Sequence, residues 1–165
     1  RLLGLSNHQT WRIERARGIA RSRGWADLGV IQQRHSYLRP KPYADLGAQR
    51  AVTPELLDYV RSEPEITLLA YSPLLSGAYA SRPDKPLPPE YRSADNTRRL
   101  EVLHEVAKEV GATPGQVVLA WMLGGDPPVI PLIGASSVAQ LEESLAASDL
   151  ELDDEQRRRL DTAGE

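Results

Sequence analysis

Four short apolar runs alternate with longer segments of helical period along this chain. The runs are predicted strands and cover residues 2–5, 28–31, 66–70 and 129–133. Beyond each run, apolar residues recur every three or four positions, as they do on the buried face of a helix. This order predicts βα units, in which helices pack against a parallel sheet. Pro131 weakens the fourth run as a strand, because proline cannot donate a hydrogen bond to a neighbouring strand.

Capping residues mark the start of three predicted helices. Thr53 and Pro54 combine an N-cap side chain with a proline at the first helical position. Two further pairs have the spacing of a capping box, in which two side chains three residues apart each bond the other's backbone. These pairs are Thr113 with Gln116 and Asp153 with Gln156. We therefore expect helices to begin at residues 54, 114 and 154.

The first predicted helix follows Ser6 and Asn7, either of which can act as its N-cap. Its apolar residues keep one face, and the opposite face carries arginines. These arginines are Arg12, Arg15, Arg17, Arg21 and Arg23. The formal charge of the whole chain is −3, which does not fit a basic nucleic-acid-binding protein. We expect the arginine face to be a solvated surface.

Composition places residues 1–165 in one soluble domain. Hydrophobic residues make up 41% and charged residues 26%, as in a typical globular chain. The absence of cysteine excludes disulfides and thiolate metal ligands and suits a reducing compartment, and the spacing of the histidines suggests no metal site. No apolar run approaches the roughly 20 residues of a membrane-spanning helix. We expect a cytoplasmic protein that has neither a membrane nor a nucleic acid as its partner.

The number of βα units is about half that of a complete barrel. A (β/α)8 barrel has eight units and usually needs ~250 residues, so the predicted fold class is α/β, of the (β/α)8 TIM-barrel type, with about four units present. Half a barrel has two unpaired edge strands and an unfilled interior, which favour pairing with a second copy or with the missing half. Arg1 stands in place of Met directly before a predicted strand, and we expect it to mark a cut end.

Small and polar residues follow the predicted strands, at the edge where barrel enzymes carry their active sites. The segments are residues 4–7 (Gly-Leu-Ser-Asn), Gln32 with His35, residues 71–74 (Tyr-Ser-Pro-Leu), and residues 134–137 (Gly-Ala-Ser-Ser) with Gln140, Glu143 and Ser144. The last segment is a turn that leads into a helix, where free backbone N–H groups can bind a phosphate. An ordinary loop with an N-cap explains the same residues, so both interpretations stay open.

Residues 71–96 hold five prolines and show neither a helical nor a strand period. We interpret this stretch as a long functional loop, because structureless loops of this length are otherwise uncommon. Its Arg82 and Arg92 can reach phosphate oxygens, although loop arginines are usually just solvated. His35 can act as a general base, but with no carboxylate partner in view a packing role is the simpler interpretation.

Together these segments resemble the C-terminal half of the aldo-keto reductases, including the potassium-channel beta subunits. The resemblance also rests on Thr113 and Pro114, on residues 116–121, and on residues 140–143 (Gln-Leu-Glu-Glu). It covers essentially the whole chain in the family's order and spacing. The resemblance implies an NADP-dependent oxidoreductase that reduces aldehydes and ketones, with a small carbonyl compound as its substrate.

The same resemblance assigns cofactor contacts to the strand ends. Ser6, Asn7 and Gln32 would hold the nicotinamide carboxamide, and the ring of Tyr71 would stack on the nicotinamide. The turn along the pyrophosphate would consist of Ser72, Pro73, Leu74, Leu75 and Ser76, with Arg82 and Arg92 as phosphate contacts. The adenosine end, including the 2′-phosphate, would contact Gly134, Ser136, Gln140, Glu143 and Ser144.

Three positions depart from the family pattern. Ser144 replaces the usual Asn at the adenine, and Gln140 stands where many members have Arg, so a weaker preference for NADP over NAD is expected. His35 replaces the common aromatic residue three positions after Gln32.

The family's catalytic Asp, Tyr, Lys and His or Asn precede the Gly-Leu-Ser-Asn strand. No residue of this chain is assigned to that tetrad, so we expect the 165-residue chain alone to be inactive. The alternative is a non-catalytic half-barrel that binds a dinucleotide or a protein partner and associates with itself.

Overall fold

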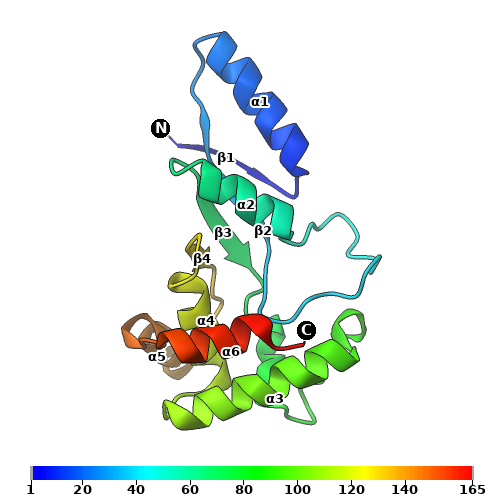
Figure 1. Ribbon diagram of the computed structural model, residues 1–165, viewed down its shortest axis with the longest axis vertical. Helices are drawn as coiled ribbons and strands as arrows, with labels where there is room; N and C mark the ends of the chain where they lie inside the picture. The colour runs from blue at the N-terminus through cyan, green and yellow to red at the C-terminus, as the bar shows by residue number, and fades with distance from the viewer. Residues whose placement is uncertain (1, 165) are drawn as a thin grey trace.

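The computed structural model describes residues 2–164, so Arg1, on which the expected cut end rests, lies outside the described residues. Its strands form one parallel sheet in the order β1-β2-β3-β4. They are β1 (Leu3–Ser6), β2 (Leu28–Arg34), β3 (Thr67–Tyr71) and β4 (Val129–Pro131). The α-helices are α1 (Thr10–Ser22), α2 (Pro54–Ser62), α3 (Ala94–Glu109), α4 (Pro114–Leu123), α5 (Val138–Leu145) and α6 (Asp154–Thr162). In Figure 1, α1 lies at one end of the molecule, and α3 to α6 gather at the other.

The predicted alternation of strands and helices is confirmed. β2 is three residues longer than expected, so Gln32 lies inside the strand rather than after it. β4 forms in spite of Pro131 because this proline is its last residue and needs no further ladder bond. The expectation of a parallel α/β sheet therefore holds for all four strands.

The two faces of the sheet have different surroundings. Ile31, Leu68 and Val129 face the helices and are at most 3% exposed. The strand register aligns Ser6, Gln32, Leu69 and Ile130 on the opposite face. On that face Ile130 is 46% exposed, and β1 and β4 are the sheet edges within residues 2–164. The expected half-barrel, with an open interior and two edge strands, is confirmed for this part of the chain.

The predicted N-caps of α2, α4 and α6 are confirmed. The Thr53 side chain accepts the backbone N–H of Leu56, and complete capping boxes form around Thr113 and Asp153. The predicted cap of α1 is wrong, since this helix begins after Gln9 and has no side-chain capping bond. Asn7 does not cap α1, because its side chain bonds residues near the carboxyl end of β3 instead.

The capping box of α4 provides a first test of these local interactions. Thr113→Ala is expected to lower the free energy of unfolding by about 1 kcal/mol, because the Gln116 N–H loses its acceptor. Urea denaturation measures the change. Thr97→Ala is the control, since Thr97 is exposed inside α3 and its loss is expected to cost less than about 0.5 kcal/mol. Equal effects of the two substitutions would contradict the capping role.

Arg17 departs most clearly from the expected solvated face of α1. Its side chain is 0% exposed, and its guanidinium donates to Glu65 at 2.7 Å, to Glu63 at 2.8 Å and to Asp27 at 3.2 Å. It also donates to the hydroxyl of Tyr59 at 2.9 Å. The expectation of a solvated arginine is therefore wrong here. The carboxylates lie just before β2 and β3, where folding brings α1 against the amino ends of the strands.

The long loop predicted over residues 71–96 is correct only in part. It contains two 3₁₀ segments, Leu75–Ala80 and Pro89–Tyr91, and α3 begins at Ala94 after the N-cap Ser93. Tyr79 and Tyr91 lie in these turns and are each 1% exposed. The segment is thus packed into the core. Turns of three to six residues are too short to produce a readable period.

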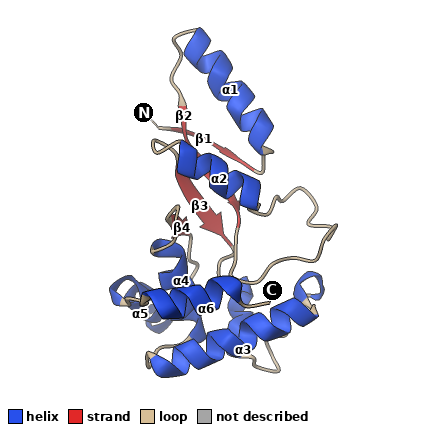
Figure 2. Cartoon of the chain, in the orientation of Figure 1, coloured by secondary structure: helices blue, strands red, loops and turns tan. Residues whose placement is uncertain are grey.

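The connection from β2 to α2 is the other long irregular segment, drawn as a tan loop in Figure 2. It returns to the sheet near its end, where the Arg34 N–H donates to the Arg50 carbonyl and the Val52 N–H donates to the Arg34 carbonyl. This return brings the backbone of Arg50 beside the carboxyl ends of the strands. Separately, the helices within residues 2–164 are too short or too polar to cross a bilayer.

Candidate functional site at the strand ends

Four of the predicted cofactor residues meet at the carboxyl edge of the sheet. Ser6 and Tyr71 are the last residues of β1 and β3, and Gln32 is paired with Ser6 in the register of β1 and β2. The Asn7 N–H donates to the Gln32 carbonyl at 3.3 Å. Because the strands are parallel, their carboxyl ends meet at one edge, and these four residues lie there, as the sequence predicted.

A hydrogen bond between Asn7 and Tyr71 joins two strand ends. The Tyr71 hydroxyl donates to Asn7 Oδ1 at 2.7 Å, and the Arg50 backbone N–H donates to the same oxygen at 3.0 Å. Burial raises the pKa of Tyr71 above its ordinary value, so the phenol stays protonated and keeps its donor. The role of Arg50 could not be found from the sequence, because a backbone N–H in an irregular loop leaves no side-chain signal.

Several residues at this edge have an unusual backbone conformation. Asn7 has φ 59° and Ser72 has φ 55°, and both therefore occupy the left-handed region that residues other than glycine rarely adopt. Leu75 and Ser76 in the following turn share this region. Such conformations cost free energy and persist only where surrounding contacts impose them, and they cluster at functional sites.

Ser6 and Gln32 leave polar groups free at this edge. Within residues 2–164, neither the Ser6 hydroxyl nor the Gln32 side-chain amide has a hydrogen-bond partner, and the exposed sheet face carries both. The amide nitrogen of Asn7 is likewise free in this part of the chain, since its bonds use only Oδ1. The three side chains together offer both donors and acceptors, which is what a planar carboxamide requires.

The residues predicted to contact the phosphates lie further apart than those at the strand ends. Ser72 and Ser76 are exposed on the turn after β3, whereas Pro73 and Leu75 are buried beneath it. Arg82 forms an ion pair with Asp84 at 2.8 Å. Arg92 donates to the Leu87 carbonyl at 2.7 Å. Both arginines thus bond within their own loop, and their assignment to a pyrophosphate stays a prediction.

The turn after β4 forms a local network. The backbone N–H and the hydroxyl of Ser136 both donate to Gln140 Oε1 at 2.9 Å. Ser137 caps α5 by accepting the Gln140 N–H at 3.3 Å. Gly134 and Glu143 are exposed and Ser144 is half-buried beside this network. The capping role is confirmed, and the phosphate-binding role stays a prediction.

His35 directly follows β2, and its backbone N–H donates to the Tyr71 carbonyl at 3.2 Å, but its ring does not join the polar side chains of the strand ends. Its ring packs against Trp121 with centroids 5.8 Å apart, and burial, aided by the charge of Arg99, lowers its pKa to about 4. No side-chain hydrogen bond connects it to another described residue. The packing interpretation of His35 is therefore confirmed over the general-base interpretation.

Comparisons with known proteins identify the family. A family model described as "Aldo/keto reductase family" matches residues 1–165. Aldo-keto reductase str7 of Strobilurus tenacellus is 37% identical over 115 residues, which are 61% of this chain and 34% of that protein. Aldo-keto reductase yakc of Schizosaccharomyces pombe, whose name specifies NADP(+), is 34% identical over 105 residues, which are 56% of this chain and 31% of that protein.

The fold gives the same result. A crystal structure of the thermostable aldo-keto reductase Tm1743 with the inhibitor epalrestat superposes with a TM-score of 0.70 and 27% identity, over 99% of this chain and 48% of that one. The fold is part of a (β/α)8 barrel, with the candidate site at the carboxyl ends of its strands. The chain belongs to the aldo/keto reductase family. Its matched residues span 31–48% of the length of these relatives. The narrower resemblance to potassium-channel beta subunits stays a prediction.

Proposed function

We propose that this chain forms the cofactor-binding half of an NADP-dependent oxidoreductase that reduces aldehydes and ketones. The observation that carries the proposal is the bond between Tyr71 and Asn7, which joins two strand ends beside the free polar groups of Ser6 and Gln32. Family membership and the NADP(+)-named relative support the same assignment.

The residues at this edge have the chemistry that the nicotinamide end of NADP requires. The free amide of Gln32, the Asn7 amide nitrogen and the Ser6 hydroxyl can bond a carboxamide from one side. The Tyr71 ring offers a flat apolar face, and its hydroxyl is held by Asn7, which fixes the orientation of the ring. The donor set therefore fits the cofactor.

When bound, NADPH supplies the hydride that reduces the carbonyl carbon. This chain's residues would orient the nicotinamide: Tyr71 by covering one face of the ring, and Gln32 with Asn7 by fixing its rotation. Gln140 and Ser136 would bind the far end of the dinucleotide. No residue of 1–165 is assigned to protonate the carbonyl oxygen, so these residues alone are expected to give no turnover with NADPH and a reactive aldehyde in a steady-state assay.

Tyr71→Ala tests the proposed binding mode. The substitution is expected to weaken NADP(+) binding about tenfold or more, because stacking on an aromatic side chain is worth roughly 1–3 kcal/mol per ring. Isothermal titration calorimetry measures the affinity, and thermal stabilisation by NADP(+) gives an independent reading. Tyr43→Ala is the matched control, since Tyr43 is fully exposed and is not among the residues assigned to the cofactor.

Two outcomes would count against this proposal. Equal NADP(+) affinity in the Tyr71 and Tyr43 variants would show that the Tyr71 ring does not contact the cofactor. No response of the unmodified protein to NADP(+) would contradict cofactor binding altogether.

The open sheet face favours a second candidate role, association with a further protein surface. Leu3, Ile130 and Leu132 are 38–46% exposed on or beside the edge strands, and unpaired edge strands are prone to add another strand. We propose that a second copy or an N-terminal half-barrel covers this face. Sedimentation of the isolated chain tests self-association: a dimer supports it, and a monomer at every concentration removes the second copy as the partner.

A further inference from the structure

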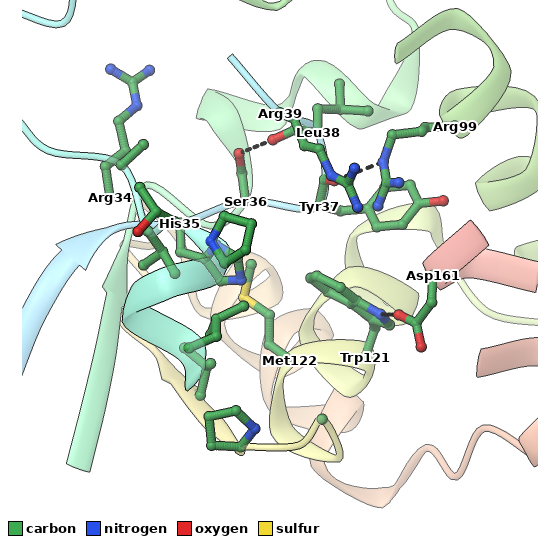
Figure 3. Close-up of a pocket in the computed structure, with 18 of the residues that line it drawn as sticks. Arg34, His35, Ser36, Tyr37, Leu38, Arg39, Arg99, Trp121, Met122 and Asp161 are labelled. Carbon is green, nitrogen blue, oxygen red and sulfur yellow. Dashed lines mark hydrogen bonds between the residues drawn. The ribbon is translucent and has the colours of Figure 1, made fainter. Parts of the chain in front are cut away.

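A separate cavity lies on the helix-covered side of the sheet. It has a volume of about 660 Å³ and is bounded by the loop after β2, the start of α2 and the end of α4. None of the residues assigned above to the cofactor lines it. Figure 3 shows its labelled side chains, which come from the last residue of β2, from the loop after β2, and from α3, α4 and α6. The cavity is thus distinct from the strand-end site, and its volume is in the range that holds a small organic molecule.

Aromatic rings form much of one wall. The rings of Tyr37 and Trp121 meet edge to face, with centroids 5.4 Å apart and an interplanar angle of 80°. The ring of His35 also packs against Trp121, tilted by 34°. The side chains of Leu57 and Met122 add aliphatic surface. Rings arranged in this way offer faces and edges to a further aromatic body.

Arg99 brings a buried positive charge to this wall. The residue is 2% exposed, and its guanidinium carbon lies 4.3 Å from the centre of the Tyr37 ring. It donates to the Tyr37 carbonyl at 3.1 Å and to the Ala163 carbonyl at 2.7 Å. These bonds use two of the five N–H groups of an arginine. Within residues 2–164, no carboxylate forms an ion pair with Arg99, so the buried cation has no counter-charge in direct contact.

Two further arginines of the lining, Arg39 and Arg157, are also outside every ion pair of residues 2–164. The guanidinium of Arg157 reaches only backbone carbonyls at the end of α4, at 3.4 and 3.5 Å. Arg39 is exposed at the rim of the cavity. The cavity therefore combines one buried cation with two less buried ones.

The acidic residues of the lining compensate this charge only in part. Asp126 accepts from Arg61 at 3.0 Å. Asp161 accepts from the uncharged indole N–H of Trp121 at 2.7 Å and attracts Arg99 without forming an ion pair with it. His35 is neutral at pH 7, because burial lowers its pKa to about 4. Burial likewise lowers the pKa of Arg99, and the attraction of Asp161 does not reverse this effect. The field in the cavity thus favours an anion.

We propose that this cavity binds a small organic carboxylate with an aromatic body, whose carboxylate bonds the free N–H groups of Arg99 and whose ring packs against Trp121. A carboxylate matches the geometry of a guanidinium and forms bonds of about twice the strength of neutral ones. The aromatic body replaces water against the rings of Tyr37 and Trp121. This site is independent of the cofactor site proposed above.

The test compares two probes of the same shape, 2-naphthoate and its uncharged analogue 2-naphthamide. The reporter is the NMR signal of the Trp121 indole N–H, which is distinguished from those of Trp11 and Trp25 with Trp→Phe variants. The expected result is a saturable shift of this signal with naphthoate. The affinity for naphthamide is expected to be lower by about tenfold or more. No saturation of the naphthoate shift by about 1 mM, or equal affinities for the two probes, would overturn the proposal.

Variants locate the binding. Arg99→Met is expected to abolish the preference for naphthoate over naphthamide. Arg99 also bonds two backbone carbonyls, so its replacement can disturb the fold, and a second variant is needed. Val52 lies half-buried in the cavity lining, and Val52→Trp fills the cavity. This variant is expected to lower the affinity for both probes at least tenfold. Arg158→Gln is the control, because Arg158 is an exposed arginine of α6 paired with Glu155.

Two outcomes separate this site from the cofactor site. NADP(+) is expected to leave naphthoate binding unchanged, whether or not it binds at the strand ends. Displacement of naphthoate by NADP(+), or undiminished naphthoate binding in Val52→Trp, would overturn the proposal and leave the proposed function untouched.

Discussion

Replacing Arg17 with methionine is expected to lower the free energy of unfolding by about 3 kcal/mol, because it removes the buried partner of several ionised groups. Asp27, Glu63 and Glu65 would remain close together without a cation. Removing one partner of a buried ion pair usually costs about 3–5 kcal/mol. The low end of this range applies here, because the carboxylates are 28–56% exposed and can be hydrated once Arg17 is gone. Urea denaturation at pH 7 measures the loss.

The physical reason lies in the balance of burial and hydrogen bonding at Arg17. Burial by itself disfavours the charged guanidinium, but hydrogen bonds to Tyr59 and the three carboxylates outweigh it and raise the pKa of Arg17. The group therefore stays charged and joins α1 to the amino ends of β2 and β3. This end of a barrel usually serves stability rather than catalysis.

Arg21→Gln is the control for this prediction. Arg21 lies one turn further along α1 and is 44% exposed. It pairs with Glu14 and with Asp27, which Arg17 also contacts. Its replacement is expected to cost less than about 1 kcal/mol, as is usual for surface ion pairs. If Arg17→Met and Arg21→Gln had equal effects, burial would not be the source of the stabilisation.

His35 is expected to make the protein less stable in acid by about 3 kcal/mol between pH 7 and pH 4. Its pKa is about 4 in the folded protein and ordinarily 6.5, so the unfolded chain binds a proton that the folded chain excludes. The free energy of unfolding therefore falls as the pH drops below about 6.5 and levels off below about 4. Burial is the main cause, and the charge of Arg99 acts in the same direction.

His35→Phe separates this contribution from other acid-sensitive groups. Phenylalanine keeps a ring against Trp121 and cannot take up a proton, so the variant is expected to lose about 3 kcal/mol less stability than the unmodified protein over the same pH interval. Urea titrations at several pH values measure both curves. Parallel curves would show that His35 does not exclude a proton in the folded state.

Local signals in the sequence predicted most of the fold. The apolar runs at residues 28–31 and 66–70 are strands, and Thr53, Thr113 and Asp153 cap the helices that follow them. Each of these features depends on residues within about four positions of one another, which is the range over which period and capping act. The predicted N-cap of α1 was wrong because it depends on a longer-range contact: the side chain of Asn7 bonds Tyr71, 64 positions away.

The sequence by itself determined that this chain forms four parallel βα units and that polar residues gather at one edge of the sheet. Only the tertiary structure decided which polar residues are buried and with what partners. Arg17 is buried because carboxylates 10 to 48 residues away surround it, and Arg99 is buried without a carboxylate because α3 packs it against the backbone of Tyr37 and Ala163. The sequence does not distinguish the two arginines, because both carry the same side chain and charge. Their environments differ because long-range packing decides which charge is compensated and which can bind a ligand.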